Sequence, residues 1–460
     1  MRTITEPSRQ IPVVDEADVV VCGGGPGGFS AAIAAARQGA KTVLIERYGF
    51  LGGAATAGLV SPLLGHTAWN SHTPIVEGLL RELTERMHAN DGAQSWAEAI
   101  QNWGIEFDPE AMKVALDEMC MEAGVKLLLH TYVADVVMDG EQIGAILIEN
   151  KSGRQAVAGR VFVDATGDAD VAYRAGAPTT HGRAFDQRPM SMGTFIHLGG
   201  LPPVNASRAA ELRELIQQET ARGRFLFYDG RFLDRCAYHK DHTSANMTRY
   251  GGDPNSAADM TRAELSVREN TWKLVRYLRE NLPGFEGVYV QQTSPGVTPR
   301  ESRQIVGPYV LTGQDVSSAA KFDDAIARGS WWIDIHCPMG WAYPAHLCRF
   351  ECPKENACPY WAAEHERMFR HAELFVPDGD WYDIPYRSLL SIGVPNLLSS
   401  GRCISATHEG MAGARVMGTC VAIGQAAGTA AALATGSNVL PAQVDVQQLR
   451  AVLRENGQLV

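Results

Sequence analysis

A glycine pattern between two apolar segments limits the folds open to this chain more than any other feature. Val19 to Cys22 form a short apolar run, as a parallel strand does when both of its faces are buried. The run leads into glycines spaced G-x-G-x-x-G, and an alanine-rich helix is predicted from about Phe29 to Gln38. Gly39 ends that helix, and Thr42 to Ile45 form a second apolar strand. This order predicts the first βαβ unit of a doubly wound α/β fold.

The residue types of this unit suit a bound dinucleotide. Gly23 permits a tight turn, Gly25 lets the backbone approach a pyrophosphate, and Gly28 lets the helix pack closely on the strand. The helix start offers N–H donors and the positive end of its dipole to phosphate groups. Glu46 follows the second strand, where a carboxylate can accept hydrogen bonds from a ribose diol. An ordinary glycine-rich turn is the alternative. The predicted dinucleotide site comprises Gly23, Gly25, Pro26, Gly27, Gly28, Glu46 and Arg47.

Two further small-residue segments extend this site. Gly52 and Gly53, followed by Ala54, let the backbone run close to a ligand that reaches beyond the pyrophosphate, which favours FAD over NAD. An ordinary glycine turn is the alternative here too. A predicted strand from Gln155 to Asp164 ends in the second segment, which would lie at the same edge of a parallel sheet. Its residues are Thr166, Gly167 and Asp168.

Near the C-terminus the pattern of strand, turn and helix returns. Asn396 to Ser400 is a short apolar strand that leads into Gly401 and Arg402. The helix predicted from Val421 to Ala434 starts near Gly418, where its N–H groups would point at the pyrimidine end of a flavin. Close packing alone also explains the glycines of this helix. With Val133, these residues complete the predicted cofactor-binding set.

Composition limits the class of protein. A chain of 460 residues holds two to three domains of ordinary size, and 45% apolar with 20% charged residues is typical of globular proteins. A net charge of -11 argues against nucleic acid or an anionic membrane as the partner. The first residues have no apolar core of the signal-peptide type, and we expect a cytoplasmic protein. The sequence leaves open whether the chain forms a homo-oligomer.

We predict a Rossmann-like FAD-binding domain in two parts, residues 1–177 and 381–460, with an inserted α+β substrate or cap domain, residues 178–380. The inserted part has more aromatic, arginine and histidine residues and fewer alternating βα signals. Its clearest predicted elements are helices over 206–222 and 261–281 and strands over 288–293 and 303–311. In the first part, helices are predicted over 75–88 and 109–123.

Several segments resemble the FAD-dependent oxidoreductase family of the glutathione-reductase-like flavoproteins, a group that includes fumarate reductase and L-aspartate oxidase. They are VVVCGGGPGGFSAAIAAARQGAKTVLIER with FLGGAATAG, VDATGDADVAYRAGA, PRESRQIVGPYVLTGQDV, YDIPYRSLL and NLLSSGRCISATHEGMAGARVMGTC. The resemblance implies FAD, a two-domain architecture and hydride transfer through flavin N5. It does not imply a substrate. No convincing counterpart precedes Gly52 for the histidine that carries covalent flavin in fumarate-reductase relatives, so we expect noncovalent FAD.

A cysteine-containing segment departs from the family pattern. Cys337, Cys348, Cys352 and Cys358 cluster where the family is shorter and poor in cysteine. Four thiolates could bind zinc or an iron–sulfur cluster, but the spacing matches no standard pattern. We interpret them as structural thiols, with a metal site or a disulfide as the alternatives, and predict no metal site.

A flavin dehydrogenase needs a base to take a proton and cationic groups to hold a polar substrate. His408 is the first candidate for the base, because the resemblance places it beside the isoalloxazine, and His336 is the second. A histidine bonded to backbone is the alternative for each. Arg303 completes the predicted catalytic set, and an arginine can equally form a structural ion pair. The other arginines in or near the resembling segments are Arg300, Arg387, Arg402 and Arg415.

The sequence thus predicts an FAD-dependent dehydrogenase or oxidase that acts on a small polar molecule, with an unknown electron acceptor. The first alternative is an NAD(P)H-coupled flavin reductase or monooxygenase, although no second G-x-G-x-x-G pattern is present. The second is an electron-transfer subunit with a cysteine-bound cluster.

Overall fold

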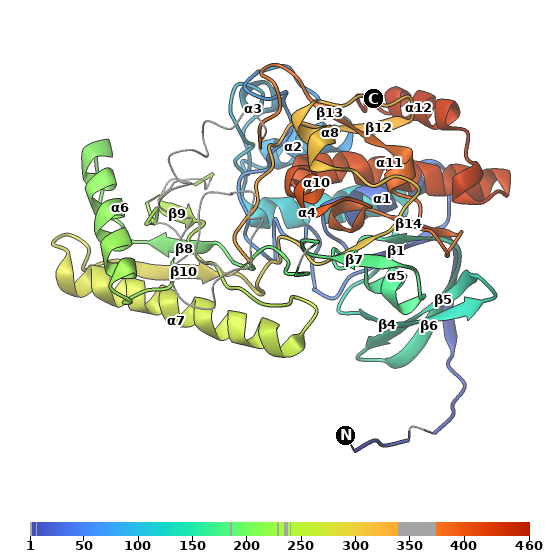
Figure 1. Ribbon diagram of the computed structural model, residues 1–460, viewed down its shortest axis with the longest axis horizontal. Coiled ribbons are helices and arrows are strands. Elements are labelled where there is room, and N and C mark those ends of the chain that lie inside the picture. Colours follow the sequence, from blue (N-terminus) through green and yellow to red (C-terminus); the bar gives the residue numbers. More distant parts are fainter. Residues whose placement is uncertain are drawn as a thin grey trace.

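A seven-stranded sheet organises the molecule (Figure 1). The computed structural model describes residues 2–5, 7–184, 186–227, 230–233, 238–239, 241–338 and 374–460. The sheet has the order β3-β2-β1-β6-β5-β4, with β14 also paired to β6. Its strands are β1 (Val13–Cys22), β2 (Thr42–Ile45), β3 (Lys126–Leu128), β4 (Tyr132–Asp139), β5 (Gln142–Asn150), β6 (Gly153–Asp164) and β14 (Leu397–Ser399). Strands β3, β2, β1, β6 and β14 pair in parallel, whereas β4, β5 and β6 form an antiparallel meander. The predicted α/β class is confirmed.

The register of the parallel strands brings distant loops together. Cys22, the last residue of β1, pairs with Asp164 at the end of β6, and Ser399 of β14 pairs with the same residue. Ala165 then donates its N–H to the carbonyl of Cys22, and Ser400 donates to the carbonyl of Asp164. Three loops from separate parts of the sequence therefore start at one edge of the sheet.

Two alanine-rich helices pack closely on each other over this sheet. They are α1 (Pro26–Arg37) and α11 (Met417–Ser437). A Cβ atom at Gly428 would lie 1.9 Å from the carbonyl oxygen of Ala31, so glycine is required for this approach. Among the described residues, α11 is the one helix long and apolar enough to cross a membrane, and 94% of its apolar window is buried inside the protein. That degree of burial is typical of a core helix.

The inserted region forms its own layer of helix on sheet, beside the nucleotide-binding part (Figure 1). Strands β10 (Tyr289–Thr293), β8 (Ile196–Gly199) and β9 (His242–Ala245) make a three-stranded antiparallel sheet. Helices α6 (Ala206–Ala221) and α7 (Ala257–Asn281) supply Leu212, Ile216, Leu274 and Val275 to its apolar core. The α+β character predicted for this region is present.

The apolar cores favour a smaller inserted unit than residues 178–380. Leu311, Val316, Ile326 and Ile333 pack in the large core that also holds α1 and α11. In the same region, β12 (Ala325–Gly329) pairs with β13 (Tyr382–Pro385) across the predicted boundary. Residues near 311–335 therefore belong structurally with the nucleotide-binding part.

Local chemistry explains where the elements start and end. Helix α4 (Pro109–Ala123) has the predicted bounds, because Asp108 caps it, Pro109 occupies its first turn and Gly124 ends it at φ 78°. The strand predicted over 303–311 is wrong in length, since β11 (Arg303–Ile305) stops before Pro308, which has no N–H to pair.

The remaining elements include β7 (Thr179–His181), α2 (Leu79–Ala89), α3 (Trp96–Ala99), α5 (Asp170–Arg174), α8 (Gly313–Ser317), α10 (His408–Ala414) and α12 (Val446–Glu455).

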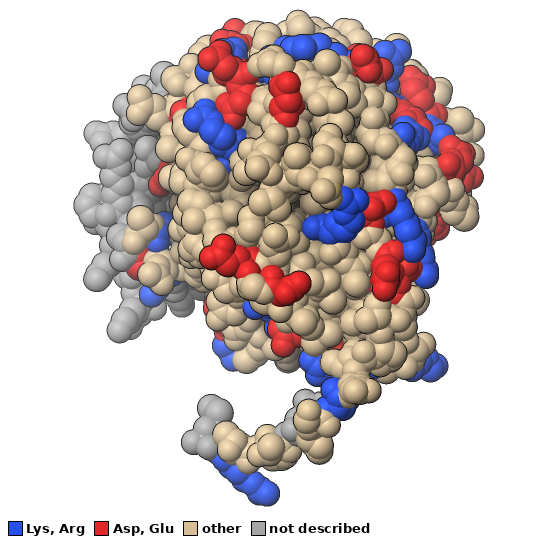
Figure 2. All heavy atoms as spheres, turned by 90° about the vertical axis from the view of Figure 1, so that its right-hand side faces the viewer, with Lys and Arg blue, Asp and Glu red and all other residues tan. Residues whose placement is uncertain are grey.

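Charged side chains on one face of the molecule alternate in sign. Figure 2 shows lysine and arginine in small groups next to aspartate and glutamate. Mixed charge of this kind is typical of a solvated surface. The expectation that the chain binds neither nucleic acid nor membrane stays a prediction.

Candidate functional site

A cleft lies at the edge of the sheet where β1, β6 and β14 end. The loops that start there line it, together with the segment after β2 and the start of α11. Of the predicted cofactor residues, those that line the cleft are Gly23, Gly25, Pro26, Gly27, Glu46, Arg47, Gly53, Ala54, Thr166, Gly167, Asp168, Gly401 and Arg402. The strand register described above brings these residues together.

Glu46 holds the glycine turn from the end of β2. Its Oε2 accepts a hydrogen bond from the N–H of Gly24 at 2.6 Å, and its Oε1 accepts one from the N–H of Tyr48 at 2.8 Å. Burial raises the pKa of Glu46, although these two N–H groups oppose the shift. The side chain fixes the shape of the turn and lines the cleft, where it can accept hydrogen bonds from ligand hydroxyl groups.

The two glycine loops leave room for an extended ligand. Gly53 lies at φ +53°, and a Cβ atom there would lie 2.6 Å from the Cα atom of Gly25. At Gly25 the added Cβ would meet only the Cα atom of Gly53, at 3.8 Å, so its other sides face open space. Gly25 precedes α1, whose first turn has no side-chain cap in the described structure. The N–H donors of that turn and the helix dipole therefore suit phosphate groups.

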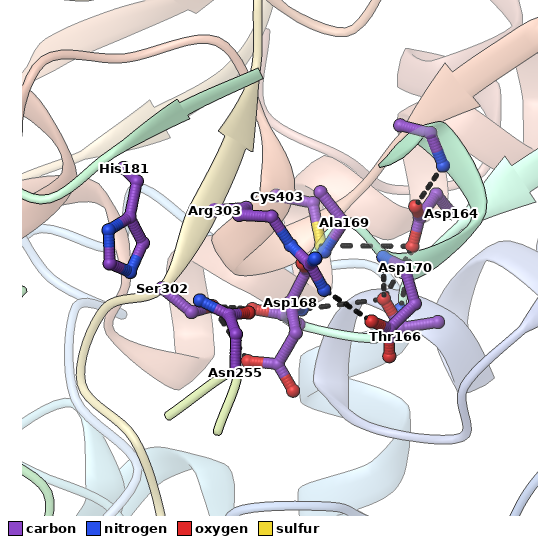
Figure 3. Close-up of polar contacts among 12 residues, drawn as sticks. Asp164, Thr166, Asp168, Ala169, Asp170, His181, Asn255, Ser302, Arg303 and Cys403 are labelled. Carbon is purple, nitrogen blue, oxygen red and sulfur yellow. Dashed lines mark hydrogen bonds and ion pairs between the residues drawn. The ribbon is translucent and has the colours of Figure 1, made fainter. Parts of the chain in front are cut away.

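Asp164 holds the turn that follows β6 (Figure 3). Its Oδ1 accepts hydrogen bonds from the N–H and the hydroxyl of Thr166, and its Oδ2 accepts one from the N–H of Ala172. Burial raises the pKa of Asp164 to about 6 against the effect of these bonds. The turn continues through Gly167 at φ +81° and presents Asp168 to the cleft.

Asp168 joins this turn to two distant segments. Its Oδ1 accepts from the hydroxyl of Ser302 at 2.7 Å and from Nη2 of Arg402 at 3.0 Å. Nη1 of Arg402 also donates to Ser302 Oγ at 3.1 Å. This network fixes the guanidinium of Arg402 in the wall of the cleft.

Arg303 contacts the same turn from outside the cleft. It donates to the carbonyl of Asp168 at 2.9 Å and pairs with Asp170 at 2.5 Å (Figure 3). Its guanidinium lies over the ring of Tyr173. These contacts occupy the side chain, and it lines neither the cleft nor the cavity described next. In the described structure Arg303 positions this turn, and its predicted catalytic role stays a prediction.

Four predicted cofactor residues do not line the cleft. Gly28 lets α1 pack closely against the end of β1, because a Cβ atom at this position would lie 1.7 Å from the carbonyl oxygen of Gly23. Gly52 faces Thr56, and Gly418 faces the carbonyl of Leu64, which supports the packing alternative for that glycine. Val133 packs in the smaller core beside β5 and β6.

A second cavity, here called the aromatic cavity, adjoins the cleft and has a volume of about 550 Å³. The wall that the two share includes Ala54, Thr298, Pro299, Arg402, Arg415 and Met417. The aromatic rings that line the cavity are Trp69, Trp103, Phe195, Trp331, Trp332 and Phe375. Trp332 stacks on Phe375 with centroids 5.1 Å apart, and Trp69 meets Trp331 edge-on at 5.9 Å. The cavity is therefore a largely aromatic chamber beside the cleft.

His336 lies in the wall of the aromatic cavity, paired with Asp334. Nε2 of His336 lies 3.3 Å from Oδ2 of Asp334, and Nη2 of Arg415 donates to the same carboxylate oxygen at 3.2 Å. Arg249 Nε donates to Nδ1 of His336 at 3.4 Å. This pattern assigns the proton of the neutral ring to Nε2 and the lone pair to Nδ1.

Electrostatics keep this pair as a neutral imidazole and a carboxylate. Burial lowers the pKa of His336 well below its ordinary value; Asp334 opposes this shift, and Arg300 and Arg249 add to it. Burial alone would raise the pKa of Asp334, but His336 and Arg415 reverse the effect and hold it below its usual range. The neutral ring, oriented by the carboxylate, can accept a proton at Nδ1 only when the 3.4 Å contact from Nε of Arg249 gives way.

His408, the first candidate for the base, has a different environment. Its Nδ1 lies 2.6 Å from Oε2 of Glu301, which also accepts from the N–H of Met190. Burial alone would lower the pKa of His408, but the charge and hydrogen bond of Glu301 raise it. His408 thus forms a buried pair with Glu301 and lines neither the cleft nor the aromatic cavity. The catalytic role predicted for His408 stays a prediction, and the described structure favours His336 as the base, because His336 lines the aromatic cavity.

Replacing Glu301 with glutamine is expected to destabilise the fold by about 3 to 5 kcal/mol near pH 6, because the partner of a buried charge is lost. The folded-state pKa of His408 is raised, so its stabilising contribution is full below the unfolded value of about 6.5. It declines as the pH rises through the folded value. Urea titrations of both proteins should show the stability gap narrowing with rising pH, and a constant gap would contradict this role.

The remaining candidates are placed as follows. Arg300 and Arg415 line the aromatic cavity, whereas Arg387 pairs with Asp324 at the surface. Among the described residues, no group of three or more His, Cys, Asp or Glu side chains has the arrangement of a metal site. Cys337 is buried, and Cys348, Cys352 and Cys358 lie outside the described residues.

Fold and site together are of the kind found in dinucleotide-binding oxidoreductases: a Rossmann-like sheet, a glycine-lined cleft at the ends of its parallel strands, and a cavity that shares a wall with the cleft. The chain belongs to the FAD dependent oxidoreductase family, whose model matches residues 18–453. The protein is an enzyme, and FAD is its cofactor. Its finer placement among the glutathione-reductase-like flavoproteins stays a prediction.

Individual relatives match only parts of the chain. Thiamine thiazole synthase of Methanococcus vannielii is 28% identical over 165 residues, which are 34% of this chain and 58% of that protein. Dihydrolipoyl dehydrogenase of Trypanosoma brucei brucei is 56% identical over 45 residues, 10% of this chain and 9% of its own. The chain therefore covers less than two thirds of the length of either. A geranylgeranyl bacteriochlorophyll reductase-like structure from Thermoplasma acidophilum is 12% identical, with a TM-score of 0.44, over 96% of this chain and 84% of that one.

Proposed function

We propose that the enzyme dehydrogenates a small organic substrate held in the aromatic cavity, with His336 as the proton acceptor. The observation that carries this proposal is the wall shared by the cleft and the aromatic cavity, beside which the Asp334–His336 pair lies. A substrate in that cavity is next to the cofactor cleft and within a chamber lined by aromatic rings.

FAD, when bound in the cleft, supplies a hydride acceptor at N5 and takes up two electrons. The chain supplies the remaining chemistry. The substrate displaces the long 3.4 Å contact from Arg249 Nε, and His336 then accepts the substrate proton at Nδ1. Loss of a hydride and a proton leaves a new double bond in the substrate. Asp334 orients the ring through Nε2 and stabilises the imidazolium that forms, and Arg415 holds Asp334 in place. The aromatic wall excludes water, which protects both the base and the reduced cofactor.

The proposal is tested by mixing the holoenzyme anaerobically with panels of alcohols, amines and activated C–C compounds. Bleaching of the oxidised flavin absorption by one of them, without NADH or NADPH, is the expected result. Rapid bleaching by NADPH alone would instead favour the NAD(P)H-coupled alternative. About four irons per chain in a metal analysis would favour the electron-transfer alternative.

A further inference from the structure

We infer that the substrate is a planar, ring-containing carboxylate, with its ring against the aromatic wall and its carboxylate on Arg300 and Arg415. This inference rests on the proposed function and specifies the substrate class of the same site. Two separate features of the aromatic cavity support it, one for the ring and one for the anion.

The ring is indicated by the geometry of the aromatic wall. Trp332 and Phe375 are stacked with an interplanar angle of 19°, Phe375 lies 5.7 Å from Trp69, and Trp69 meets Trp331. Trp332 is buried, so the continuous aromatic surface is fixed by its own packing before any ligand arrives. A flat aromatic group of a ligand binds such a wall most favourably, because offset or edge-on ring contacts add about 0.5 to 1.5 kcal/mol of binding free energy beyond that of burial.

The anion is indicated by the charge of the same cavity. Four arginines line it, Arg231, Arg300, Arg402 and Arg415. Of these, Arg402 pairs with Asp168, and Arg415 pairs with Asp334, the one carboxylate among the described lining residues. His336 adds no charge, for the reasons given above. A cationic cavity inside a protein of net charge -11 is a local arrangement, and it attracts anions into a chamber of low dielectric.

Asn246 concentrates this charge. Its Oδ1 accepts from Nη2 of Arg300 at 3.2 Å and from Nη1 of Arg249 at 2.8 Å, so one amide holds two guanidinium groups close together. Arg300 Nη1 is fixed further by the carbonyl of Ser191 at 3.0 Å. A carboxylate beside Arg300 relieves the repulsion between the two cations and accepts charge-assisted hydrogen bonds, which are about twice as strong as neutral ones.

The size of the cavity agrees with this class. Drug-sized ligands occupy sites of about 300 to 1,000 Å³, and the aromatic cavity has about 550 Å³. One or two fused rings with a carboxylate fit within that volume. Trp103 is 63% exposed although it lines the cavity, which places the entrance beside its ring.

The test measures binding to the holoenzyme by calorimetry and by the flavin difference spectrum, with 2-naphthoate, 2-naphthamide and cyclohexanecarboxylate as probes. We expect 2-naphthoate to bind at least tenfold more tightly than either of the others. Replacing Arg300 with glutamine should raise the Kd for 2-naphthoate at least tenfold and change the Kd for 2-naphthamide less than twofold. Arg387 pairs with Asp324 at the surface, so Arg387→Gln is the matched control and should change neither of these two affinities.

A second variant separates the ring contact from the charge. Trp103→Ala, at an exposed position that does not disturb the core, should weaken 2-naphthoate and 2-naphthamide by the same factor. Equal affinity for the carboxylate and the amide in the unsubstituted enzyme, or equal losses with both probes in Arg300→Gln, would overturn the inference. Turnover is not required for these readouts: binding without flavin reduction would contradict dehydrogenation alone, and turnover confined to neutral or cationic compounds would contradict the substrate class alone.

Discussion

Replacing Gly25 with valine is expected to weaken FAD binding while leaving the chain folded. The added Cβ atom would meet only Gly53, at an ordinary contact distance of 3.8 Å, and the backbone of Gly25 at φ -72° accepts any residue. The branched side chain would therefore lie in the cleft, over the first turn of α1. That is the space through which the pyrophosphate must approach the N–H donors.

We expect the Kd for FAD to rise at least tenfold, which corresponds to about 1.4 kcal/mol. Flavin content per chain after gel filtration gives the measurement, and circular dichroism reports the fold. Gly436→Val is the matched control, because a Cβ atom there meets nothing within 4 Å and the position is remote from the cleft. An unchanged Kd for FAD in Gly25→Val would show that the cofactor does not use this turn.

Replacing His336 with asparagine is expected to slow flavin reduction by about 10² to 10⁴-fold, the usual contribution of a general base. The variant should retain FAD, because His336 lines the aromatic cavity rather than the cleft. His408→Asn is the comparison. It breaks the pair with Glu301, so it should lose stability but keep its rate per flavin-bound chain. If His408→Asn reduces its flavin slowly and His336→Asn reduces it at the rate of the unsubstituted enzyme, the two roles are reversed.

The pH dependence of the rate gives a separate readout of His336. Because its pKa is held well below the ordinary value of about 6.5, the free enzyme keeps the neutral base as the pH falls from 8 to about 6. We expect kcat/KM to stay level over that range. A decline centred near 6.5 would indicate an unshifted histidine as the base.

The turns that line the cleft could be located from the sequence because they follow strands at fixed positions, and their contacts with the cofactor stay a prediction. The end of β1, the end of β6 and the end of β14 each carry a small-residue turn, and parallel pairing brings such turns together without further information. Helix α4 could also be predicted from the sequence, because Asp108, Pro109 and Gly124 mark its two ends.

The substrate side of the site could not be predicted in this way. The aromatic wall combines Trp69, Trp331 and Phe375 from loops far apart in the sequence, and no periodic pattern links them. The two histidines illustrate the same limit. His408 lies in a segment that resembles the family, but its contact with Glu301 decides its charge. His336 became the stronger candidate only when Asp334 and the adjacent cavity were known.

The most direct test of this account is a crystal structure of the holoenzyme with 2-naphthoate bound. The account predicts the pyrophosphate beside Gly25 and the first turn of α1, the flavin ring at the wall formed by Arg402, Arg415 and Met417, and the probe in the aromatic cavity. A flavin ring placed away from that wall, or an aromatic cavity closed by its own side chains in the holoenzyme, would contradict it.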